Sequence, residues 1–255
     1  MQVIMVDLHS HILPGLDDGA ANIAESVEMA KQAEQEGIQM IVATPHHQNG
    51  QYENEKTAVE AAVLIMNQHL NDANIGVTIY AGQEVRMYGE LVEDFEKNKL
   101  LPIGESTHML IEFPSSGIPA FTEQVLFDIQ LRGITPIIVH PERNMAISEN
   151  PDKLYKLIKN GALSQITAAS INGQFGKKIK QLSMQLIEAN LTHFIASDAH
   201  NTTTRAFGLR QAYDAIDPSY AEYFKENAQI VLNGGYITKE QPYHVARKKK
   251  FLGLF

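Results

Sequence analysis

Two hydrophobic patterns alternate along this chain of 255 residues. Short apolar runs, typical of buried strands, are followed by longer segments in which apolar residues recur with helical spacing. Strands are predicted near residues 3–6, 38–43, 77–81, 109–113, 134–139, 164–168 and 193–196. Helices are predicted near residues 22–36, 53–73, 88–97 and 120–132, between Pro151 and Gly161, and near 177–190.

The first predicted helix has recognisable ends. Asn22 and Glu25 match a capping box, in which each side chain satisfies a backbone N–H group that the helix leaves unpaired. Gly37 follows the last helical position and favours the left-handed conformation that ends many helices. We therefore expect this helix to span residues 22–36.

Strands that alternate with helices favour a parallel sheet with right-handed crossover connections. Closing seven such strands into an incomplete or distorted β/α barrel would bury the apolar side chains on both faces of the sheet. No low-complexity stretch, clear internal repeat or change of composition divides the sequence. We therefore predict a single α/β domain over residues 1–255, with a distorted, TIM-like barrel fold.

Histidines and carboxylates follow the predicted strands at their carboxyl ends. His9 and His11 come after the first apolar run, and alternate side chains of a strand point to the same face, roughly 7 Å apart. That separation lets both imidazoles bind one metal ion through bonds of about 2 Å. Later strand ends carry the same residue types, namely His46, Glu84, Glu112, His140, Asp198 and His200. Since β/α barrels build their active sites at this rim, we predict a metal centre there.

The sequence has no cysteine, so nitrogen and oxygen atoms must bind any metal. Such ligands suit Mn, Fe, Zn or Mg, and the sequence does not choose among these ions. The candidate ligands are too many for one ion, and carboxylates such as Glu84 and Asp198 can bridge two. Two ions about 3.5 to 4 Å apart are the usual device for hydrolysing phosphoesters. We therefore expect a hydrolase in which a hydroxide held between two metals attacks phosphorus.

Charge and hydropathy exclude other classes of protein. The formal net charge of −9 argues against non-specific nucleic-acid binding, which needs a basic surface. The first residues lack the pattern of a signal peptide, and no apolar run approaches the roughly 20 residues that span a bilayer. We therefore expect a cytoplasmic protein without stable membrane insertion.

The order of these motifs resembles that of the PHP (polymerase and histidinol phosphatase) superfamily. The matching segments are Asp7-x-His9-Ser-His11, Asp17-Asp18-Gly19, Thr44-Pro45-His46, Gly82-x-Glu84, Ile111-Glu112-Phe113, His140-Pro-Glu-Arg143 and Ser197-Asp198-x-His200. Within the superfamily they are most similar to the bacterial manganese-dependent protein-tyrosine phosphatases of capsule and exopolysaccharide operons. The family fold is a distorted seven-stranded β/α barrel with three metals at its rim, which agrees with the strands and ligands predicted above.

The resemblance also implies which residues hold each metal. The first metal would be bound by His9, His11, Glu84 and Asp198. Glu84 would bridge to the second metal, whose other ligands would be Glu112 and His140. The third metal would be bound by Asp18, His46 and His200. Up to three divalent ions per chain are therefore expected, with manganese favoured and Fe, Mg or Zn as alternatives.

Several neighbouring residues are harder to assign from the pattern. Asp17 and Asp18 are adjacent in one loop, and the pattern does not distinguish them. His47 follows His46 too closely to share its direction, so we expect it at the surface or behind the metal ligands. The remaining histidines are expected to serve packing or solvation only: His69, His108, His193 and His244.

Two arginines are candidates for binding a phosphoryl group, because a guanidinium can bind phosphate through two hydrogen bonds. Arg143 lies on a predicted rim loop, and Arg205 follows the last metal-ligand motif. For Arg143 the alternative is a structural salt bridge with Glu142 or another acid. Arg210 is expected on a helix surface.

By resemblance, the predicted reaction is hydrolysis of phosphotyrosine in proteins. The implied target is the tyrosine-rich tail of a bacterial tyrosine autokinase that controls polysaccharide synthesis. A phosphocysteine route is impossible in a chain without cysteine. Two alternatives stay open. One is a phosphatase for small molecules such as histidinol phosphate, or a nuclease, and the other is a non-catalytic regulator that contains metals and binds the kinase.

The C-terminal segment has a strong bias, with four basic residues at 247–250 followed by mainly apolar residues at 251–255. It is either a solvated end that packs partly on the barrel or an element that docks on an acidic partner, a membrane surface or another subunit. Homo-oligomerisation therefore stays open.

Overall fold

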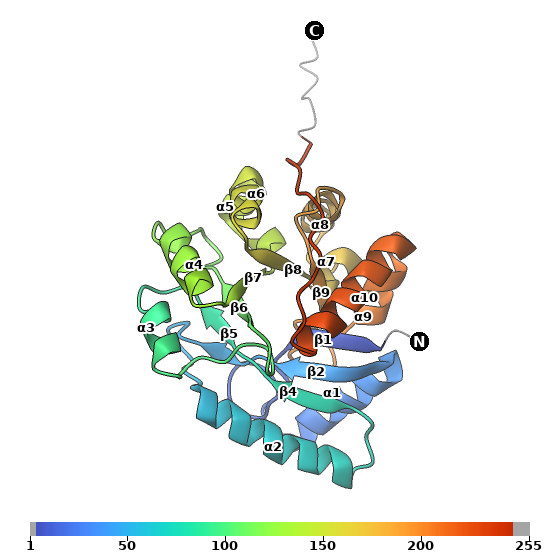
Figure 1. The fold of residues 1–255 in the computed structure, drawn as a ribbon. Coiled ribbons are helices and arrows are strands. Elements are labelled where there is room, and N and C mark those ends of the chain that lie inside the picture. Colours follow the sequence, from blue (N-terminus) through green and yellow to red (C-terminus); the bar gives the residue numbers. More distant parts are fainter. Residues whose placement is uncertain (1–3, 247–255) are drawn as a thin grey trace.

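Parallel strands form two sheets in the computed structural model, which describes residues 4–246 (Figure 1). The first sheet has the order β1-β2-β4 and the second the order β3-β5-β6-β7-β8-β9. Neighbouring strands are parallel throughout. The strands are β1 Met5–Ser10, β2 Ile38–Ala43, β3 His46–His47, β4 Thr78–Ala81, β5 Glu84–Arg86, β6 His108–Glu112, β7 Thr135–Val139, β8 Leu163–Thr167 and β9 Phe194–Ala196. The predicted α/β fold with a parallel sheet arrangement is confirmed.

The described residues contain nine strands, whereas the sequence predicts seven, because β3 and β5 follow the predicted strands 38–43 and 77–81 as separate short strands. Thr44-Pro45 separates β2 from β3, and Gly82-Gln83 separates β4 from β5. Proline has no N–H group to donate to a ladder. A Cβ atom at the glycine would lie 2.8 Å from Cγ1 of Val42, so only glycine allows this approach to β2. Each break lies directly before a candidate metal ligand, His46 or Glu84.

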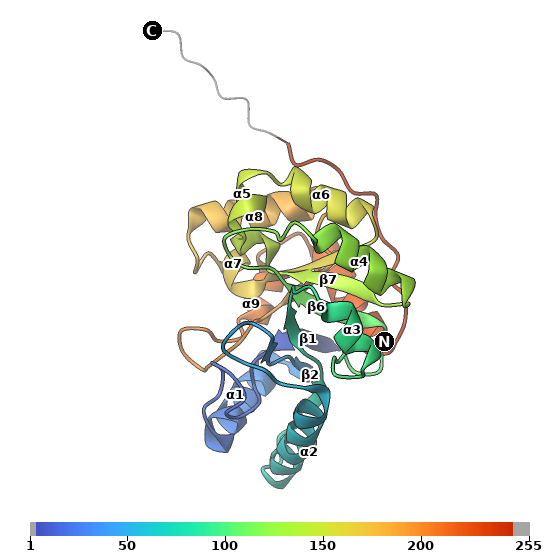
Figure 2. The same ribbon diagram turned by 90° about the vertical axis from the view of Figure 1, so that its left-hand side faces the viewer.

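Helices surround the strands on the outside (Figure 1). They are α1 Ile23–Glu36, α2 Lys56–Asp72, α3 Leu91–Glu96, α4 Thr122–Leu131, α5 Met145–Glu149, α6 Asp152–Lys159, α7 Ala168–Asn172, α8 Lys177–Glu188, α9 Leu209–Asp214 and α10 Pro218–Leu232, with a 3₁₀ turn η1 at Pro141–Arg143. α1 and α2 lie side by side against the three-stranded sheet (Figure 2). The predicted cap of α1 is confirmed, since Asn22 accepts a hydrogen bond from the Glu25 N–H and Gly37 has a left-handed φ of 86°.

The predicted helices are all present, with small shifts at their ends, but four further helices were not predicted: α5, α7, α9 and α10. The longest of them, α10, carries ordinary signals. Asp217 accepts a hydrogen bond from the Ser219 N–H, and Pro218 occupies the first helical position. Phe224 and Val231 are buried at helical spacing. The prediction follows the alternation of strands and helices, which ends at β9, and therefore misses a helix that follows another helix.

The strands are buried on both faces by two apolar clusters. The larger cluster packs the strands against the helices and includes Ile41, Ile111 and Ile195. The smaller cluster joins side chains from six strands, namely Val6, Leu8, Val42, Leu110, Ile137, Val139, Leu163, Phe194 and Ala196. Burial on both faces explains why the strands read as continuous apolar runs rather than as alternating ones.

Polar contacts tie the end of β1 to the segment after β9. The buried Asp7 carboxylate accepts hydrogen bonds from the Ser197 N–H at 2.9 Å and from its hydroxyl at 2.5 Å. The backbone N–H of Asp198 donates to the carbonyl oxygen of His9 at 2.9 Å. The first and last segments that carry candidate metal ligands therefore lie side by side, although they are separated by most of the sequence.

No helix within residues 4–246 is long and apolar enough to cross a membrane. The basic and apolar C-terminal segment, residues 247–255, lies outside the described residues, and so do the alternatives considered for it.

The imidazole of His193, just before β9, is buried and neutral in the folded protein. Its Nδ1 atom accepts a hydrogen bond from the Ser164 N–H at 3.1 Å. Burial lowers the pKa of its imidazole to about 3, and the charge of Lys239 acts in the same direction. The ring is therefore neutral in the folded protein at a pH where an exposed histidine is already protonated.

This burial predicts a pH dependence of stability. Between about pH 6.5 and pH 3 the unfolded chain binds a proton on His193 that the folded chain does not, so the free energy of unfolding falls as the pH falls. From pH 7.5 to pH 4.5 the free energy of unfolding should fall in both proteins. We expect this fall to be smaller by on the order of 2 kcal/mol in His193→Asn, which keeps a hydrogen-bond acceptor, than in the unmodified protein. Urea unfolding at both pH values, with chelator present throughout, measures the difference.

His69→Asn provides the matched control, because His69 lies half-buried on α2. It should leave the pH dependence of unfolding unchanged. An equal loss of stability in the His193 variant and the unmodified protein would show that His193 is protonated in the folded state.

Candidate metal centre

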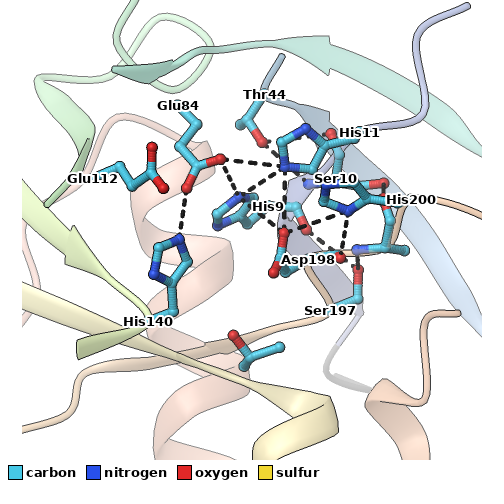
Figure 3. Close-up of polar contacts among 12 residues, drawn as sticks. His9, Ser10, His11, Thr44, Glu84, Glu112, His140, Ser197, Asp198 and His200 are labelled. Carbon is cyan, nitrogen blue, oxygen red and sulfur yellow. Dashed lines mark hydrogen bonds and ion pairs between the residues drawn. The ribbon is translucent and has the colours of Figure 1, made fainter. Parts of the chain in front are cut away.

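The predicted ligands converge at the carboxyl ends of the strands (Figure 3). Each comes from a strand or from the loop that follows one, and none lies on a helix: His9, His11, Asp18, His46, Glu84, Glu112, His140, Asp198 and His200. Within residues 4–246, three groups have ligand atoms within 4.8 Å of one another: His9-His11-Glu84, His11-Asp18-His46-His200 and His46-Glu84-Glu112. Asp198 and His140 contact members of these groups, so the structure brings all the predicted ligands together.

The imidazoles of His9 and His11 face a common point. Their Nε2 atoms lie 3.3 Å apart, and two ligands that each lie about 2.1 Å from one ion are separated by about 3.0 to 3.4 Å. Oε2 of Glu84 lies 3.3 Å from both nitrogens, and Oδ1 of Asp198 lies 3.5 and 3.3 Å from them. Asp7 pairs with Ile41 and Ser10 pairs with Ala43, so β1 has one more residue than β2 in this stretch. Such an irregularity can change the direction of a side chain.

The two carboxylate oxygens of Glu84 face different partners. Oε2 points to His9 and His11, whereas Oε1 lies 2.7 Å from Nε2 of His140 (Figure 3). Oε2 also lies 2.9 Å from Nδ1 of His46. A carboxylate in this position can bind one cation with each oxygen. Glu112 lies beside it, where Oε2 of Glu112 accepts a hydrogen bond from the Arg86 Nε–H at 2.8 Å.

Asp18, His46 and His200 form the outer part of the cluster. Oδ1 of Asp18 lies 3.4 Å from Nε2 of His46 and 3.3 Å from Nε2 of His200. The other ring nitrogen of His46, Nδ1, lies 2.9 Å from Oε2 of Glu84. His46 therefore presents one nitrogen to the outer residues and one to Glu84, a position between two groups that the sequence pattern did not indicate.

Unpaired polar atoms provide a test of whether this cluster fits a metal. Among the described residues, some buried side-chain atoms of the cluster form no hydrogen bond although charged groups lie close to them, including Nδ1 of His46, Oε2 of Glu84 and Nε2 of His200. Each such atom costs roughly 1 to 3 kcal/mol when it stays unpaired. A divalent cation bound by oxygen and nitrogen would satisfy them, so the residues present fit a metal centre.

Neighbouring groups orient the imidazoles. Nδ1 of His9 lies 2.9 Å from Oε1 of Gln165, and Nδ1 of His11 lies 2.6 Å from Oδ2 of Asp17. Acceptors at Nδ1 hold the ring proton there and leave Nε2 free for a metal. Asp17 thus supports His11, whereas Asp18 faces the cluster directly. Sequence reasoning missed Gln165, because a neutral amide within a buried strand gives no recognisable signal.

Two of the predicted ligands have left-handed backbone conformations. The φ angles of His140 and Asp198 are 36° and 56°, which are uncommon for residues with a Cβ atom. Hydrogen bonds hold both residues in place, from the His140 N–H to the Gln165 carbonyl at 2.7 Å and from the Asp198 N–H to the His9 carbonyl at 2.9 Å. Backbone strain of this kind concentrates at functional sites.

The charges of the cluster shift the pKa values of its members. Burial would raise the pKa of Glu84, but the imidazoles of His9 and His46 hold it well below its usual range. Burial raises the pKa of Glu112 to about 7, and the adjacent Glu84 carboxylate adds to this effect. Burial lowers the pKa of His140 to about 4, and a neighbouring guanidinium acts in the same direction. Protons compete with cations for these atoms, so metal affinity should increase as the pH rises.

Both predicted arginines lie at the edge of the cluster and share one carboxylate oxygen. Nη1 of Arg143 lies 2.9 Å and Nη2 of Arg205 lies 3.0 Å from Oδ2 of Asp198. The salt bridge considered for Arg143 is therefore present, but with Asp198 rather than with Glu142. The Glu142 carboxylate is buried and accepts hydrogen bonds from the Thr167 N–H at the end of β8 and from the Ser170 hydroxyl in α7 instead. The arginine side chains remain 22% and 34% exposed, so they can also reach a ligand from solvent.

The remaining predicted residues lie outside the cluster. His47 is buried and accepts a hydrogen bond from the Asn54 N–H at 3.1 Å, so it supports the loop behind the ligands and is not at the surface. Arg210 lies on α9, where its Nε–H donates to the Glu36 carbonyl, as expected for a helix surface. The four histidines assigned to packing or solvation belong to none of the three groups: His69, His108, His193 and His244.

Sequence comparison matches residues 5–235 to a family described as capsular polysaccharide synthesis, CpsB/CapC. The chain is similar to the tyrosine-protein phosphatase YwqE of Bacillus subtilis, with 45% identity over 251 residues that cover 97% of this chain and 99% of the relative. It is also similar to the putative tyrosine-protein phosphatase CapC of Staphylococcus aureus, with 43% identity over 98% of this chain and 100% of the relative.

Structural comparison agrees with the sequence comparison. The chain matches a protein from the crystal structures of YwqE from Bacillus subtilis and CpsB from Streptococcus pneumoniae, described as unique metal-dependent tyrosine phosphatases. The match has a TM-score of 0.93 and 45% identity, and it covers 95% of this chain and 100% of that chain.

The outer position of His46 predicts a partial loss of metal. We expect His46→Ala to keep its fold and to bind one divalent ion fewer per chain than the unmodified protein, because the first group, His9-His11-Glu84, does not include His46. Circular dichroism checks the fold, and elemental analysis of protein equilibrated with excess metal counts the ions.

His69→Ala is the control, because that histidine lies on α2 away from the cluster. It should keep the full metal content. Unchanged metal content in the His46 variant would show that His46 is no ligand, and loss of two ions would show that it serves two sites.

Proposed function

We propose that this chain, which belongs to the CpsB/CapC family of capsular polysaccharide synthesis, is a metal-dependent protein-tyrosine phosphatase. The observation that carries the proposal is a cluster of histidines and carboxylates with unpaired buried atoms, flanked by two arginines. The relatives with 45% and 43% identity are a tyrosine-protein phosphatase and a putative one. Capsular polysaccharide synthesis is accordingly the process in which this enzyme would act.

The proposed ligand sets follow the geometry and the family resemblance. His9, His11, Glu84 and Asp198 would hold a first ion, Glu84, Glu112 and His140 a second, and Asp18, His46 and His200 a third. Such ions supply an activated water molecule as nucleophile and neutralise charge on the phosphoryl oxygens. Manganese is the ion that the resemblance favours, and the oxygen and nitrogen donors also suit Fe, Mg or Zn.

The chain's own residues would bind and orient the phosphoryl group. Arg143 and Arg205 both contact the same carboxylate oxygen of Asp198 and are partly exposed, so both guanidinium groups lie at the edge of the centre. A guanidinium binds phosphoryl oxygens bidentately and stabilises the charge that develops in the transition state. The phenol of tyrosine has a pKa near 10, so its departure needs less help from an acid than that of an alkoxide. Positioning and electrostatic stabilisation would therefore suffice.

We also infer that the two sheets together form one distorted barrel within a single domain. Ser10 and Ala199 form a parallel bridge that joins the end of β1 to the segment after β9. The smaller apolar cluster, with side chains from six strands, is what the interior of a barrel requires. If β2 continues as β3 and β4 as β5, the strands occupy seven positions, as the sequence predicts.

The proposed physiological substrate is phosphotyrosine in a bacterial protein. The resemblance favours the tyrosine-rich tail of a bacterial tyrosine kinase, and a cytoplasmic location follows from such a partner. A phosphatase for small molecules, a nuclease and a metal-containing regulator that binds the kinase are the alternatives, and each is an outcome of the experiment below.

Activity assays on protein of defined metal content test the function. Removal of divalent ions by a chelator should abolish hydrolysis of a phosphotyrosyl peptide, and added Mn²⁺ should restore it. The nearby arginines carry only a single positive charge each and cannot replace a divalent cation. We expect kcat/KM for the phosphotyrosyl peptide to exceed that for a phosphoseryl peptide by at least about tenfold, a difference of about 1.4 kcal/mol.

Histidinol phosphate and a short oligonucleotide complete the assay. A preference for either one would assign the chain to the corresponding alternative. Full turnover by thoroughly stripped protein would exclude the metal mechanism, and no turnover of any substrate by metal-loaded protein would favour the regulator.

The proposed role of Arg143 predicts a separable defect. Arg143→Ala should weaken inhibition by phosphate or vanadate roughly 10- to 100-fold and lower turnover, since hydrogen bonds to charged groups contribute about 1.5 to 3 kcal/mol. Inhibition constants, turnover and metal content are measured at saturating metal. Arg132→Ala removes a surface ion pair with Glu96 and should change none of them. Loss of metal from the Arg143 variant would instead assign this arginine a structural role.

A further inference from the structure

A pocket with a volume of about 290 Å³ lies beside the candidate metal centre. Glu112, His140 and Arg143 form one of its sides. The remaining walls are formed by Phe113, Ser115, Val139 and Asn144. The pocket therefore adjoins both the proposed second metal site and a proposed phosphate-binding arginine.

The walls of this pocket are fixed by hydrogen bonds. The Asn144 amide group donates to the carbonyl oxygens of Pro114 and Gly117 at 2.9 and 3.0 Å. The Met145 N–H donates to the Ser115 carbonyl at 2.9 Å. These bonds tie the loop after β6 to the start of α5. The pocket is thus present before any ligand binds.

The metal centre is buried on its inner side and opens to solvent at Asp18, at Arg205 and at this pocket. The side chains of His9 and Glu84 are fully buried. Those of Glu112 and His140 are each 12% exposed, and that of Arg143 is 22% exposed. A phosphoryl group bound at the centre would therefore direct its ester oxygen and leaving group outward, and the pocket lies on this exposed side.

We propose that this pocket binds the phenyl ring of phosphotyrosine while the phosphoryl group lies at the metal centre. The inference rests on the proposed function and adds a site for the leaving group. Phe113 and Val139, both buried, supply apolar walls. An apolar cavity of about 150 Å³ is enough to hold benzene, so a phenyl ring fits in the volume available.

The pocket also gives a physical reason for selecting tyrosine over serine. The phenyl ring places the ester oxygen several bonds farther from the peptide backbone than the serine side chain does. A phosphotyrosyl peptide fills the space between the surface and the metal centre with apolar atoms, whereas a phosphoseryl peptide leaves that space to water. Burial of one aromatic ring corresponds to about 10- to 100-fold in affinity.

Filling the pocket tests the assignment. Ser115 is exposed and lines the pocket, whereas the adjacent Ser116 is exposed and does not. We expect Ser115→Phe to raise KM for a phosphotyrosyl peptide by at least about tenfold, as the new ring occupies the site of the substrate ring. Ser115→Val should give a smaller increase. Ser116→Phe, which adds the same bulk one residue away, should leave KM unchanged.

Inhibition by inorganic phosphate separates the ring site from the metal centre. Phosphate has no ring, so its inhibition constant and the metal content should stay unchanged in both Ser115 variants. An unchanged KM in Ser115→Phe, or an equal weakening of phosphate and peptide binding, would overturn the ring site. Lack of phosphotyrosyl activity in the unmodified protein would instead overturn the proposed function, so the two failures are distinct.

Discussion

The buried carboxylate of Glu84 is the constraint on which the rest of the site depends. It is fully buried, and imidazole nitrogens of His9, His11, His46 and His140 lie between 2.7 and 3.3 Å from its oxygens. An isolated buried charge would be destabilising by several kcal/mol, and it is tolerated only with close partners of opposite charge or a bound metal. These partners come from β1 and the residue after it, from β3 and from the residue after β7, so several strand ends must meet around one side chain. The parallel arrangement of the strands satisfies this requirement.

Irregular positions in the strands accompany the ligands. β1 gains a residue relative to β2 near His9, and the breaks between β2 and β3 and between β4 and β5 immediately precede His46 and Glu84. His140 and Asp198 adopt left-handed backbone conformations. Regular strands would direct neighbouring side chains to opposite faces, whereas these irregularities direct several ligands toward a common centre. The regular parts of the strands, buried on both faces, hold the irregular ends rigidly in place.

The sequence predicts seven of the nine strands, and it predicts which histidines and carboxylates the structure brings together, because both leave local signals. Apolar runs mark buried strands, and a histidine or carboxylate directly after such a run is conspicuous. Gln165, which orients His9, is missed because its role depends on contact between strands far apart in the sequence. The functions of Asp17 and Asp18 differ only in the direction of their side chains, which adjacent positions in a loop do not reveal. α10 is missed for another reason, since its local signals are clear but the expected alternation of elements had ended.

The position of Asp198 couples two kinds of ligand. Its Oδ1 atom faces the imidazoles of the proposed first metal site, while its Oδ2 atom binds both Arg143 and Arg205. An arginine that turns toward a phosphoryl group shares its positive charge between that group and Asp198, and the carboxylate then has more negative charge to offer a cation. Anion affinity and cation affinity are then linked, and thermodynamic reciprocity requires each to change the other by the same factor. The enzyme would consequently hold its metals most tightly while substrate or product occupies the site, and a cell short of phosphorylated substrate would contain more of the metal-depleted form.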